Sequence, residues 1–568
     1  MTCYAVYLEL DRDGTTMAHV PELVGCTVRA RSRAAALEQT PAAIRAYLAW
    51  LRRHQELAPE DGPIEVAVAG EGAGGPFAPG DATALFPADA APLTDEDLAR
   101  YTRLLAHSRA DLLSLTGGLS DDLLDWRPSP DDWHLRRILR HIGNAEEWYV
   151  SRLVPPETLP AEWEHDEELP LYEFLEMERR TALARLAQLT AAERRAVCYP
   201  TRWTHHPEEA WTARKSLRRF LEHEREHTGQ VRQVLAARRK HLLAHLAAAR
   251  GALLEPLLNL DARDLVETPV YSGWTAKDAL AHIAAWDRWV RREIGRLVAG
   301  EEPDSSAVRD INAYNARNVA AWKDRSLDEV VAELRAARSE WVSWMRGLSE
   351  EDFFRPRPMG KGDWWVPTWI EVFREHDLEE HAHQLVEWKK QRSESAVGPR
   401  AILAAALEAR REELLAAAEL VPPEALAARP VCGVWTLQDV LGHVADWESW
   451  ALGGLRDMAA GRKPDLALVT DEEAWNQEHA AARRGQTWDQ VWADFDATRR
   501  ELVAILNGMS QEELGRVFPG VWSKETTPYA WFLVAYAHDR EHAQDVRVAM
   551  DALTGPAEPG PAKAHRSR

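Results

Sequence analysis

The sequence predicts a mainly α-helical protein, in which three tandem four-helix bundles follow a small α+β domain. Three observations predict this fold class. Apolar residues recur every three to four positions after residue 95, which is the period of an α-helix. A frame of Trp, His and Trp occurs three times in this part of the chain. The first 70 residues instead alternate apolar and polar residues, as strands do.

Residues 1–70 predict three short strands, a helix and a last strand. The alternating stretch CYAVYLELDRDGTTMAHVPELVGCTVRARS contains Asp13-Gly14, a pair typical of a hairpin turn. Helical spacing follows in AAALEQTPAAIRAYLAWLRRHQ, and PIEVAVAG has the character of a strand. We expect Pro41 to lie near the start of the helix or at a kink, because proline disrupts a helix interior.

Two segments have the composition of connections rather than of folded elements. Residues 71–94 are rich in Gly, Ala and Pro and predict a linker, with Phe77 and Phe86 as candidate anchors on a neighbouring domain. Residues 553–568, which include TGPAEPGPAKAHRSR, predict a disordered tail.

The helical part divides into three copies of similar length, each long enough for four helices and their loops. We expect the bundles at 95–238, 239–392 and 398–552. Residues 230–250 contain no helix breaker, so one helix can run from the first copy into the second. Gly398-Pro399 separates the second and third copies more clearly.

Composition excludes several classes of function. A chain of 568 residues is too long for one core. The net charge of −22, without a concentrated basic region, argues against a nucleic-acid or anionic-membrane partner. No apolar run is long enough to span a bilayer. Four scattered cysteines do not make a disulfide framework. These features predict a soluble, cytoplasmic protein.

The repeated frame consists of a Trp, a His eight residues later, an acidic residue five after the His, and a second Trp two further on. The three copies read Trp133, His141, Glu146, Trp148; Trp274, His282, Asp287, Trp289; and Trp435, His443, Glu448, Trp450. In copies two and three the first Trp precedes Thr-x-x-Asp, a capping box that starts a helix. Copy one lacks this box, and Asp131 or Asp132 is the candidate cap.

Each copy ends with a second histidine motif. The pairs His223/His227 and His538/His542 are four residues apart and so share one helix face. His376 and His381 of copy two are five apart, which turns the side chains about 140° from each other on a regular helix. Two alternatives remain open. A helix bulge can turn both histidine side chains toward the same point, or Asp377 rather than His376 is the ligand that pairs with His381.

One inward histidine and a histidine pair on another helix make a set of three nitrogen ligands. Neutral imidazole binds zinc, nickel or copper well, and three protein ligands leave a position open for water or substrate. Such a site can activate a water or hold a thiolate as the nucleophile. The simpler interpretation is that these histidines are packed core residues or solvated helix residues, and that the repetition preserves packing alone.

Tryptophans on the same helix face as the first histidine predict an aromatic pocket. Positions four and seven after the His lie on its face. The candidate lining residues are Trp148, Trp286, Trp289, Trp447 and Trp450. The acids at position five are expected to point to solvent or to a neighbouring helix, in a structural role, so no proton-transfer residue can be named. The four cysteines are interpreted as ordinary thiols.

The capped Trp-x7-His helix with a late His-x3-His motif resembles the DinB-like four-helix bundle superfamily. Relatives there include bacillithiol and mycothiol S-transferases, mycothiol-dependent maleylpyruvate isomerase and the colibactin self-resistance group. Copies two and three are most similar to the last group, through INAYNARN and WNQEHAAARRGQTWDQVWADF. The resemblance covers about 95–552 and implies an up-down-down-up bundle with a divalent metal on three histidines. The implied ligands are His141, His223, His227; His282, His381 with His376 or Asp377; and His443, His538, His542.

The stretch YLELDRDGTTMAHVPELVGC followed by a helix resembles a HicB-like antitoxin domain over roughly 70 residues. That resemblance implies a partial RNase H-like fold and a protein partner, although no DNA-binding segment follows it.

The sequence is compatible with three functions. The first is a metal-dependent transferase or hydrolase acting on small electrophiles for detoxification, with zinc or nickel and a low-molecular-weight thiol as cosubstrate. The second is a protein that sequesters a toxic small molecule without turnover. The third is a toxin–antitoxin component that binds a protein through its N-terminal domain.

Overall fold

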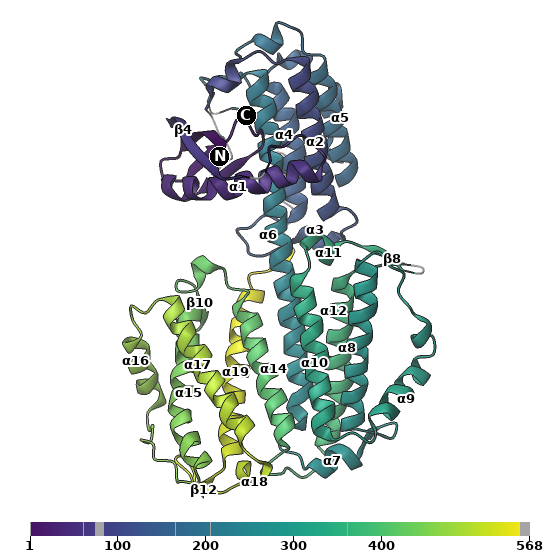
Figure 1. The fold of residues 1–568 in the computed structure, drawn as a ribbon, viewed down its shortest axis with the longest axis vertical. Coiled ribbons are helices and arrows are strands. Elements are labelled where there is room, and N and C mark those ends of the chain that lie inside the picture. The colour runs from purple at the N-terminus through teal and green to yellow at the C-terminus, as the bar shows by residue number, and fades with distance from the viewer. Residues whose placement is uncertain are drawn as a thin grey trace. The chain divides into compact units, whose positions relative to one another are not determined.

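The computed structural model describes residues 2–60, 62–73, 84–164, 166–204, 206–359 and 362–556, and these form two compact units. Of these residues, those up to 234 together with Pro556 form unit 1, and those from 235 to 555 form unit 2. Figure 1 shows the elements, which are mainly helices. The predicted fold class is confirmed.

Unit 1 begins with a four-stranded sheet and one helix, in the predicted order. Its elements are β1 (Thr2–Leu10), β2 (Thr16–His19), β3 (Thr27–Ala30), α1 (Arg33–Arg53) and β4 (Ile64–Ala73). The sheet order is β3-β2-β1-β4, with β1 and β4 parallel and the other pairs antiparallel. Pro41 lies inside α1, so of the two predicted positions, near the helix start or at a kink, the first is wrong.

The rest of unit 1 is a four-helix bundle. Its helices are α2 (Asp95–Thr116), α4 (Leu135–Ser151), α5 (Leu171–Ala187) and the first part of α6 (Ala213–Leu254). Short elements connect them: η1 (Pro87–Ala90), α3 (Asp121–Asp125), β5 (Trp126–Arg127), η2 (Pro156–Thr158), η3 (Ala161–Glu164), η4 (Asp166–Glu168) and η5 (Glu193–Arg195).

The sheet and the first bundle share one hydrophobic core. Val6 and Leu48 of the α+β part belong to the same buried cluster as Leu104 and Leu217 of the bundle. Within the predicted linker, Phe86 is buried against the ring of Tyr7, with centroids 4.9 Å apart. The other candidate anchor, Phe77, lies outside the described residues.

Unit 2 contains the second and third bundles. The second bundle is made of the rest of α6, α8 (Ala276–Val298), α10 (Leu327–Gly347) and a composite last helix: α12 (Val366–Glu375), the π-helix η8 (His376–Ala382) and α13 (His383–Lys389). The third bundle is made of α14 (Arg400–Ala418), α15 (Leu437–Ala459), α17 (Trp488–Gly508) and α19 (Pro528–Asp551).

Short elements join these helices. In the second bundle they are η6 (Glu255–Leu257), α7 (Ala262–Glu267), β6 (Pro269–Tyr271), β7 (Trp274–Thr275), η7 (Ser306–Val308), α9 (Ile311–Trp322), α11 (Glu350–Phe354), β8 (Arg357–Met359) and β9 (Gly362–Trp364). In the third they are η9 (Pro423–Ala425), β10 (Pro430–Cys432), β11 (Trp435–Thr436), α16 (Glu472–Ala482), α18 (Gln511–Leu514), β12 (Phe518–Pro519) and β13 (Glu525–Thr526); β14 (Gly555–Pro556) follows α19.

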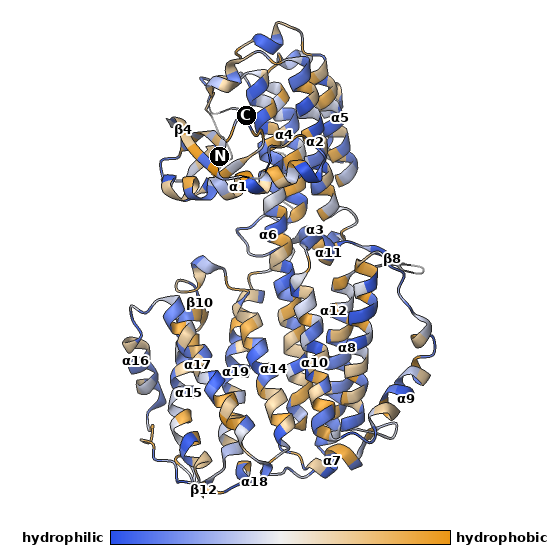
Figure 2. Ribbon diagram, in the orientation of Figure 1, coloured by the Kyte–Doolittle hydropathy of each residue, from blue (hydrophilic) through white to orange (hydrophobic). Residues whose placement is uncertain are grey.

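The second and third bundles share their core. Leu280 and Leu334 of the second bundle are buried in the same apolar cluster as Leu403, Leu455 and Phe532 of the third. In Figure 1 the long helices of unit 2 stand side by side, with α9 and α16 at opposite edges. Hydrophobic and hydrophilic residues alternate along them in Figure 2, as expected for helices with one buried face.

Helix α6 runs without a break through Ala213–Leu254. The continuous helix expected across residues 230–250 is therefore present, and the sequence boundary at 238/239 falls inside it. None of the described helices is both long and apolar enough to cross a membrane. Residues 557–568 of the predicted tail lie outside the described part of the chain.

Candidate metal centres

The helix that carries the first histidine of each set starts directly after the first Trp of the frame. Thr275 and Thr436 each close the predicted capping box at the start of α8 and α15. In α4 the cap is the side chain of His134, so the prediction of Asp131 or Asp132 at this position is wrong. The caps fix where each helix begins. They thereby determine toward which side of the helix the following histidine points.

In unit 1 the structure brings together His141 of α4 with His223 and His227 of α6. The Nε2 atoms of His141 and His223 lie 2.9 Å apart. The ring of His227 lies 4.7 Å from that of His141 and 4.4 Å from that of His223, between centroids. The three residues form one group of potential metal ligands.

In the second bundle the π-helix resolves the irregular spacing. Five residues span about one turn of a π-helix, so His376 and His381 of η8 point the same way. The Nε2 atom of His376 lies 3.1 Å from that of His282 and 3.1 Å from that of His381. Of the two alternatives, the bulge is the one found. Asp377 is fully buried and pairs with arginines instead.

The third bundle uses a regular helix for the same purpose. The Nε2 atom of His538 lies 2.8 Å from that of His443 and 3.1 Å from that of His542. In each bundle the first Trp of the frame contacts the first histidine: the ring centroids of Trp133–His141, Trp274–His282 and Trp435–His443 are 5.0, 5.0 and 4.6 Å apart.

These separations fit a divalent ion. Three nitrogens about 2.1 Å from one ion, at angles of about 90–109°, lie about 3.0–3.4 Å apart. The Nε2–Nε2 distances of 2.8–3.1 Å in the three centres are close to that range. Burial, followed by the neighbouring imidazoles, lowers the pKa of His282, His376 and His443 to about 3. The imidazoles are therefore neutral at pH 7, which is the form that binds a metal.

A partner on Nδ1 leaves Nε2 of His227 free in the first centre. The side-chain oxygen of Gln230 lies 2.8 Å from Nδ1 of His227. This oxygen only accepts, so Nδ1 carries the hydrogen and Nε2 keeps its lone pair. In the third centre a carboxylate oxygen of Asp545 lies 3.4 Å from Nδ1 of His542 without forming a hydrogen bond. The hydroxyl of Tyr271 lies 3.2 Å from Nδ1 of His381.

Beside each histidine set lies a buried quartet of two arginines and two acids, one from each of the four long helices. In every bundle both arginines contact both acids. The quartets are Arg109, Glu146, Arg179, Glu224; Arg250, Asp287, Arg338, Asp377; and Arg411, Glu448, Arg499, Asp539. We call these the charge quartets.

The charge quartets show where the acids of the repeated frame point. Glu146, Asp287 and Glu448 are buried and face neighbouring helices, so the alternative of solvent exposure is wrong. The arginines were missed because they lie in no recognised motif. A signal was available, since the first arginine precedes the acid of the frame by 37 residues in all three copies.

The tryptophans predicted to line a pocket divide into two groups. Those seven residues after the histidine pack on a Trp near the start of the last helix, with centroids 5.4–5.8 Å apart: Trp148 on Trp211, Trp289 on Trp369, and Trp450 on Trp531. Those four residues after it, Trp286 and Trp447, each donate an indole N–H to an asparagine, Asn315 at 3.0 Å and Asn476 at 2.9 Å.

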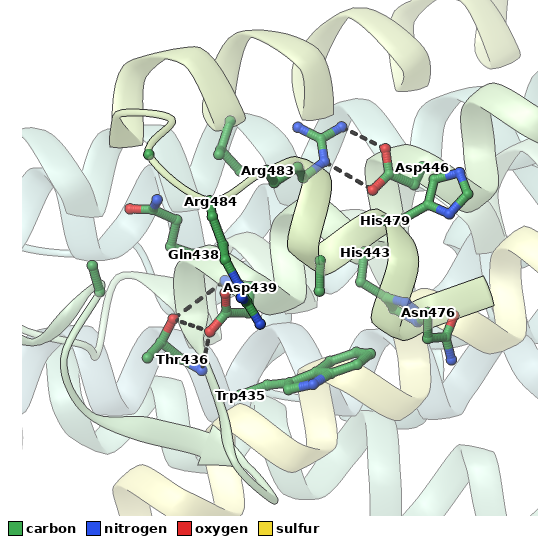
Figure 3. Close-up of a pocket in the computed structure, with 14 residues that line it drawn as sticks. Trp435, Thr436, Gln438, Asp439, His443, Asp446, Asn476, His479, Arg483 and Arg484 are labelled. Atoms are coloured by element: carbon green, nitrogen blue, oxygen red, sulfur yellow. Dashed lines mark hydrogen bonds and ion pairs between the residues drawn. The ribbon is translucent and has the colours of Figure 1, made fainter. Parts of the chain in front are cut away.

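A cavity of about 220 Å³ opens at the third set and is lined by His443. Its aromatic wall is Trp435, whereas Trp447 and Trp450 are not among its lining residues. Figure 3 shows the polar residues around it, and most of these come from α15 and the segment around α16. Asn476, His479 and Arg484 of that segment were not singled out from the sequence.

Two further groups of potential ligands occur in unit 2. His241 and His245 of α6 both lie 3.3 Å from one oxygen of Asp551 in α19. Cys432 of β10 lies 3.2 Å from Asp545, the residue beside His542. Burial first, and then Asp545, raises the pKa of the Cys432 thiol to about 11, which keeps it protonated at pH 7.

Comparison with known protein families identifies the family of the three bundles. The model of the DinB superfamily matches residues 104–231, 245–385 and 406–546, one match for each set of three histidines. The chain therefore belongs to the DinB superfamily, with three tandem DinB-like repeats. The resemblance inferred from the histidine and tryptophan frame is confirmed in this respect.

A short relative matches a further part of the sequence. The UPF0150 protein Ta0767 of Thermoplasma acidophilum is 37% identical over 65 residues, which are 11% of this chain and 94% of that protein. No solved structure matches the chain.

Proposed function

We propose that this DinB-superfamily protein binds divalent metal ions at three histidine centres and acts as a transferase or hydrolase on small electrophilic molecules. The observation that carries the proposal is the convergence of three imidazoles, from two helices, in each bundle. A bound zinc or nickel ion with an open position would make a water or a thiol nucleophilic near neutral pH.

The chain's own residues supply the rest of such a centre. His443, His538 and His542 hold the ion in the third bundle, and the equivalent residues hold it in the other two. Trp435 packs on His443 and shields one side of the imidazole from water. The side-chain oxygen of Gln230 holds His227 in the tautomer that leaves Nε2 free for a metal.

The charge quartets support these centres without taking part in the reaction. Glu224, Asp377 and Asp539 each follow the first histidine of the last helix directly. Their ion pairs to two arginines fix the rotation of that helix, because a buried carboxylate cannot leave its partners without a large cost. The histidine pair on the neighbouring face is thereby held toward the first histidine.

Elemental analysis of the purified full chain tests metal binding. We expect wild type to hold tightly bound zinc or nickel, and His443→Ala and His542→Ala each to lose about one ion per chain. His206→Asn, a change at a half-exposed histidine beside Glu208, is the matched control and should keep every ion. An equal metal content in wild type and both alanine variants would contradict the proposal.

A sequestering protein is the second candidate, because the same centre is repeated three times in one chain. Incubation of metal-loaded protein with an excess of a small electrophile, 1-chloro-2,4-dinitrobenzene, and a thiol distinguishes the two. Release of more than three equivalents of product per chain identifies an enzyme, and a stoichiometric end point identifies capture.

A protein partner for the N-terminal part is a separate proposal, which rests on its HicB-like resemblance. One surface is already occupied, because His19 of β2 is fully buried and contacts Glu222 of α6 at 3.1 Å. A partner would therefore bind the part of the sheet and α1 that faces away from the bundle. A pull-down with the full chain as bait, compared with a full chain that carries Val68→Asp at an exposed position of β4, tests this.

A further inference from the structure

We infer that the third metal centre is equipped for acid–base chemistry on a small anionic molecule, with His479 as proton acceptor and Arg484 as the anion-binding group. This inference rests on the proposed function, because it requires an ion at His443. It adds the ligand class and the proton acceptor, and it separates the third centre from the second.

The hydrogen bonding of His479 fixes which of its nitrogens can accept a proton. Its Nδ1 lies 2.9 Å from the backbone oxygen of Trp475, and its ring stacks on that indole with centroids 3.7 Å apart. A carbonyl oxygen only accepts, so Nδ1 carries the hydrogen and Nε2 has the lone pair. His479 lines the same cavity as His443, which places a base in the wall of the centre.

Asn476 is held in a fixed orientation one turn before His479. Its side-chain oxygen accepts the indole N–H of Trp447 at 2.9 Å. The amide nitrogen of Asn476 is thereby identified, and it has no partner among the described residues. Since Asn476 also lines the cavity, this N–H₂ group is available to an oxygen of a bound molecule.

Arg484 is the cation of the cavity that no described carboxylate neutralises. The neighbouring Arg483 pairs with Asp446 at 2.7 Å and with Asp494 at 3.0 Å. Asp439 accepts from the backbone N–H and hydroxyl of Thr436. In Figure 3 the side chain of Arg484 extends toward Asp439 and the indole of Trp435, and no ion pair joins Arg484 to Asp439 among the described residues. Its exposed guanidinium suits a carboxylate or another small anion.

The second bundle has the same arrangement of tryptophan and asparagine, but an asparagine stands at the position of His479. Trp286 donates to Asn315 there as Trp447 does to Asn476. Three residues later stands Asn318, whose amide nitrogen donates to the backbone oxygen of Tyr314 at 3.0 Å. Asn318 thus bonds to the residue four before it, as His479 does, but an amide oxygen cannot take up a proton at neutral pH. The two centres differ at the position that would move the proton.

The proton transfer follows from this geometry. Arg484, His443 and His479 line one cavity, so a thiol whose carboxylate binds Arg484 and whose sulfur binds beside His443 would lose its S–H proton to Nε2 of His479. The electron pair left on sulfur forms a bond to an electrophilic carbon of the second substrate, and the leaving group departs with its bonding pair. The imidazolium then returns its proton to water.

The anion-binding group is tested with a matched pair of thiols on the cobalt-loaded full chain. N-acetylcysteine and its amide carry the same thiol and differ in one charge. We expect the acid to bind about tenfold tighter than the amide, measured by titration of the cobalt absorption. Arg484→Gln should abolish that preference, and Arg500→Gln, which changes an exposed arginine paired with Asp496, should preserve it. Equal binding of acid and amide to wild type would overturn this assignment, as would a preference that survives in Arg484→Gln.

The proton acceptor is tested by counting protons in the same titration, with calorimetry in buffers of different ionisation enthalpy. Wild type should release fewer protons per bound thiol than His479→Asn, because Nε2 of His479 accepts the thiol proton in wild type. His479→Asn copies the residue of the second bundle and should release close to one, while His206→Asn should match wild type. The same proton count in wild type and His479→Asn would overturn the role of His479.

Cobalt content separates this inference from the proposed function. If wild type and His443→Ala hold the same amount of cobalt, the proposed function fails and this inference fails with it. If wild type holds more cobalt than His443→Ala but the two thiols bind alike, the metal centre stands and the inference alone is wrong.

Discussion

The second and third bundles hold the same three imidazoles by different means. In the third, α19 places His538 and His542 four residues apart on a regular helix. In the second, one extra residue separates His376 from His381, and η8 absorbs it as a π-helix. The Nε2–Nε2 distances nevertheless agree within 0.3 Å, at 3.1 and 3.1 Å against 2.8 and 3.1 Å. The comparison teaches that the position of the nitrogens is specified, and that the spacing in the sequence is only one way to reach it.

Deletion of one residue between the two histidines of the last helix should have the largest effect, and it should affect the second and third bundles differently. Removal of Glu379, an exposed residue of η8, turns the π-helix into a regular helix with His-x3-His spacing, and we expect the metal to stay bound. Removal of Glu541 from α19 rotates His542 and all later residues by about 100°, so we expect loss of the third ion and cooperative destabilisation. Metal content and thermal unfolding measure both. Loss of the second ion in the Glu379 deletion would show that the π-helix has a role of its own.

Substitution of one arginine of a charge quartet should have the next largest effect, and it should lower the stability of the second and third bundles alike. Arg250→Met and Arg411→Met each leave two buried carboxylates with a single arginine, and breaking a buried ion pair costs about 3–5 kcal/mol. We expect that loss in the free energy of unfolding, measured with denaturant. Glu501→Gln is the control, because its pair with Arg456 is exposed and contributes at most about 1 kcal/mol. A loss in Arg250→Met no larger than in the control would remove the structural role of the quartet.

Acid should destabilise both metal-free centres. His282, His376 and His443 have pKa values of about 3 in the folded chain, below the ordinary value of about 6.5 in the unfolded chain. The unfolded state therefore binds more protons between those values, and stability falls as pH is lowered through that window. Each such histidine contributes up to about 1.4 kcal/mol per pH unit.

Denaturant unfolding of the metal-free chain between pH 7 and pH 4 measures this effect. His443→Gln should have a shallower slope than wild type, because one histidine no longer titrates. A stability independent of pH over this range would contradict the burial of neutral imidazoles.

The smallest effect is expected at the residue three before the frame Trp. Tyr271→Phe removes the hydroxyl beside Nδ1 of His381, and we expect about tenfold weaker metal binding in the second bundle. Cys432→Ala changes the equivalent position of the third bundle, where the thiol reaches Asp545 rather than a histidine, and should have less effect. Competition with a metal-binding dye measures both. Equal effects would mean that the Tyr271 hydroxyl does not support His381.

The sequence predicts those parts of the molecule that depend on local periodicity. Helix spacing, capping boxes and the repeated histidines identified the fold class and the three groups of imidazoles. Long-range partners were not accessible in this way. The arginines of the charge quartets meet their acids across helices, and no local pattern shows that Arg250 faces Asp287.

The π-helix η8 illustrates a second limit of prediction from the sequence. Five-residue spacing is compatible with a bulge or with a change of ligand, and only the surrounding packing decides. Asp377 could not serve as the alternative ligand once two buried arginines neutralise it. His479 was missed for a related reason, because its role depends on the backbone oxygen of Trp475 and on the neighbouring cavity rather than on its own spacing.

The charge quartets have a consequence for how such a chain can arise. Each quartet is complete within one bundle and sums to zero charge, so a copied bundle carries its own counter-ions. Duplication of a gene segment that encodes one bundle therefore leaves no member of its quartet without an opposite charge in the product.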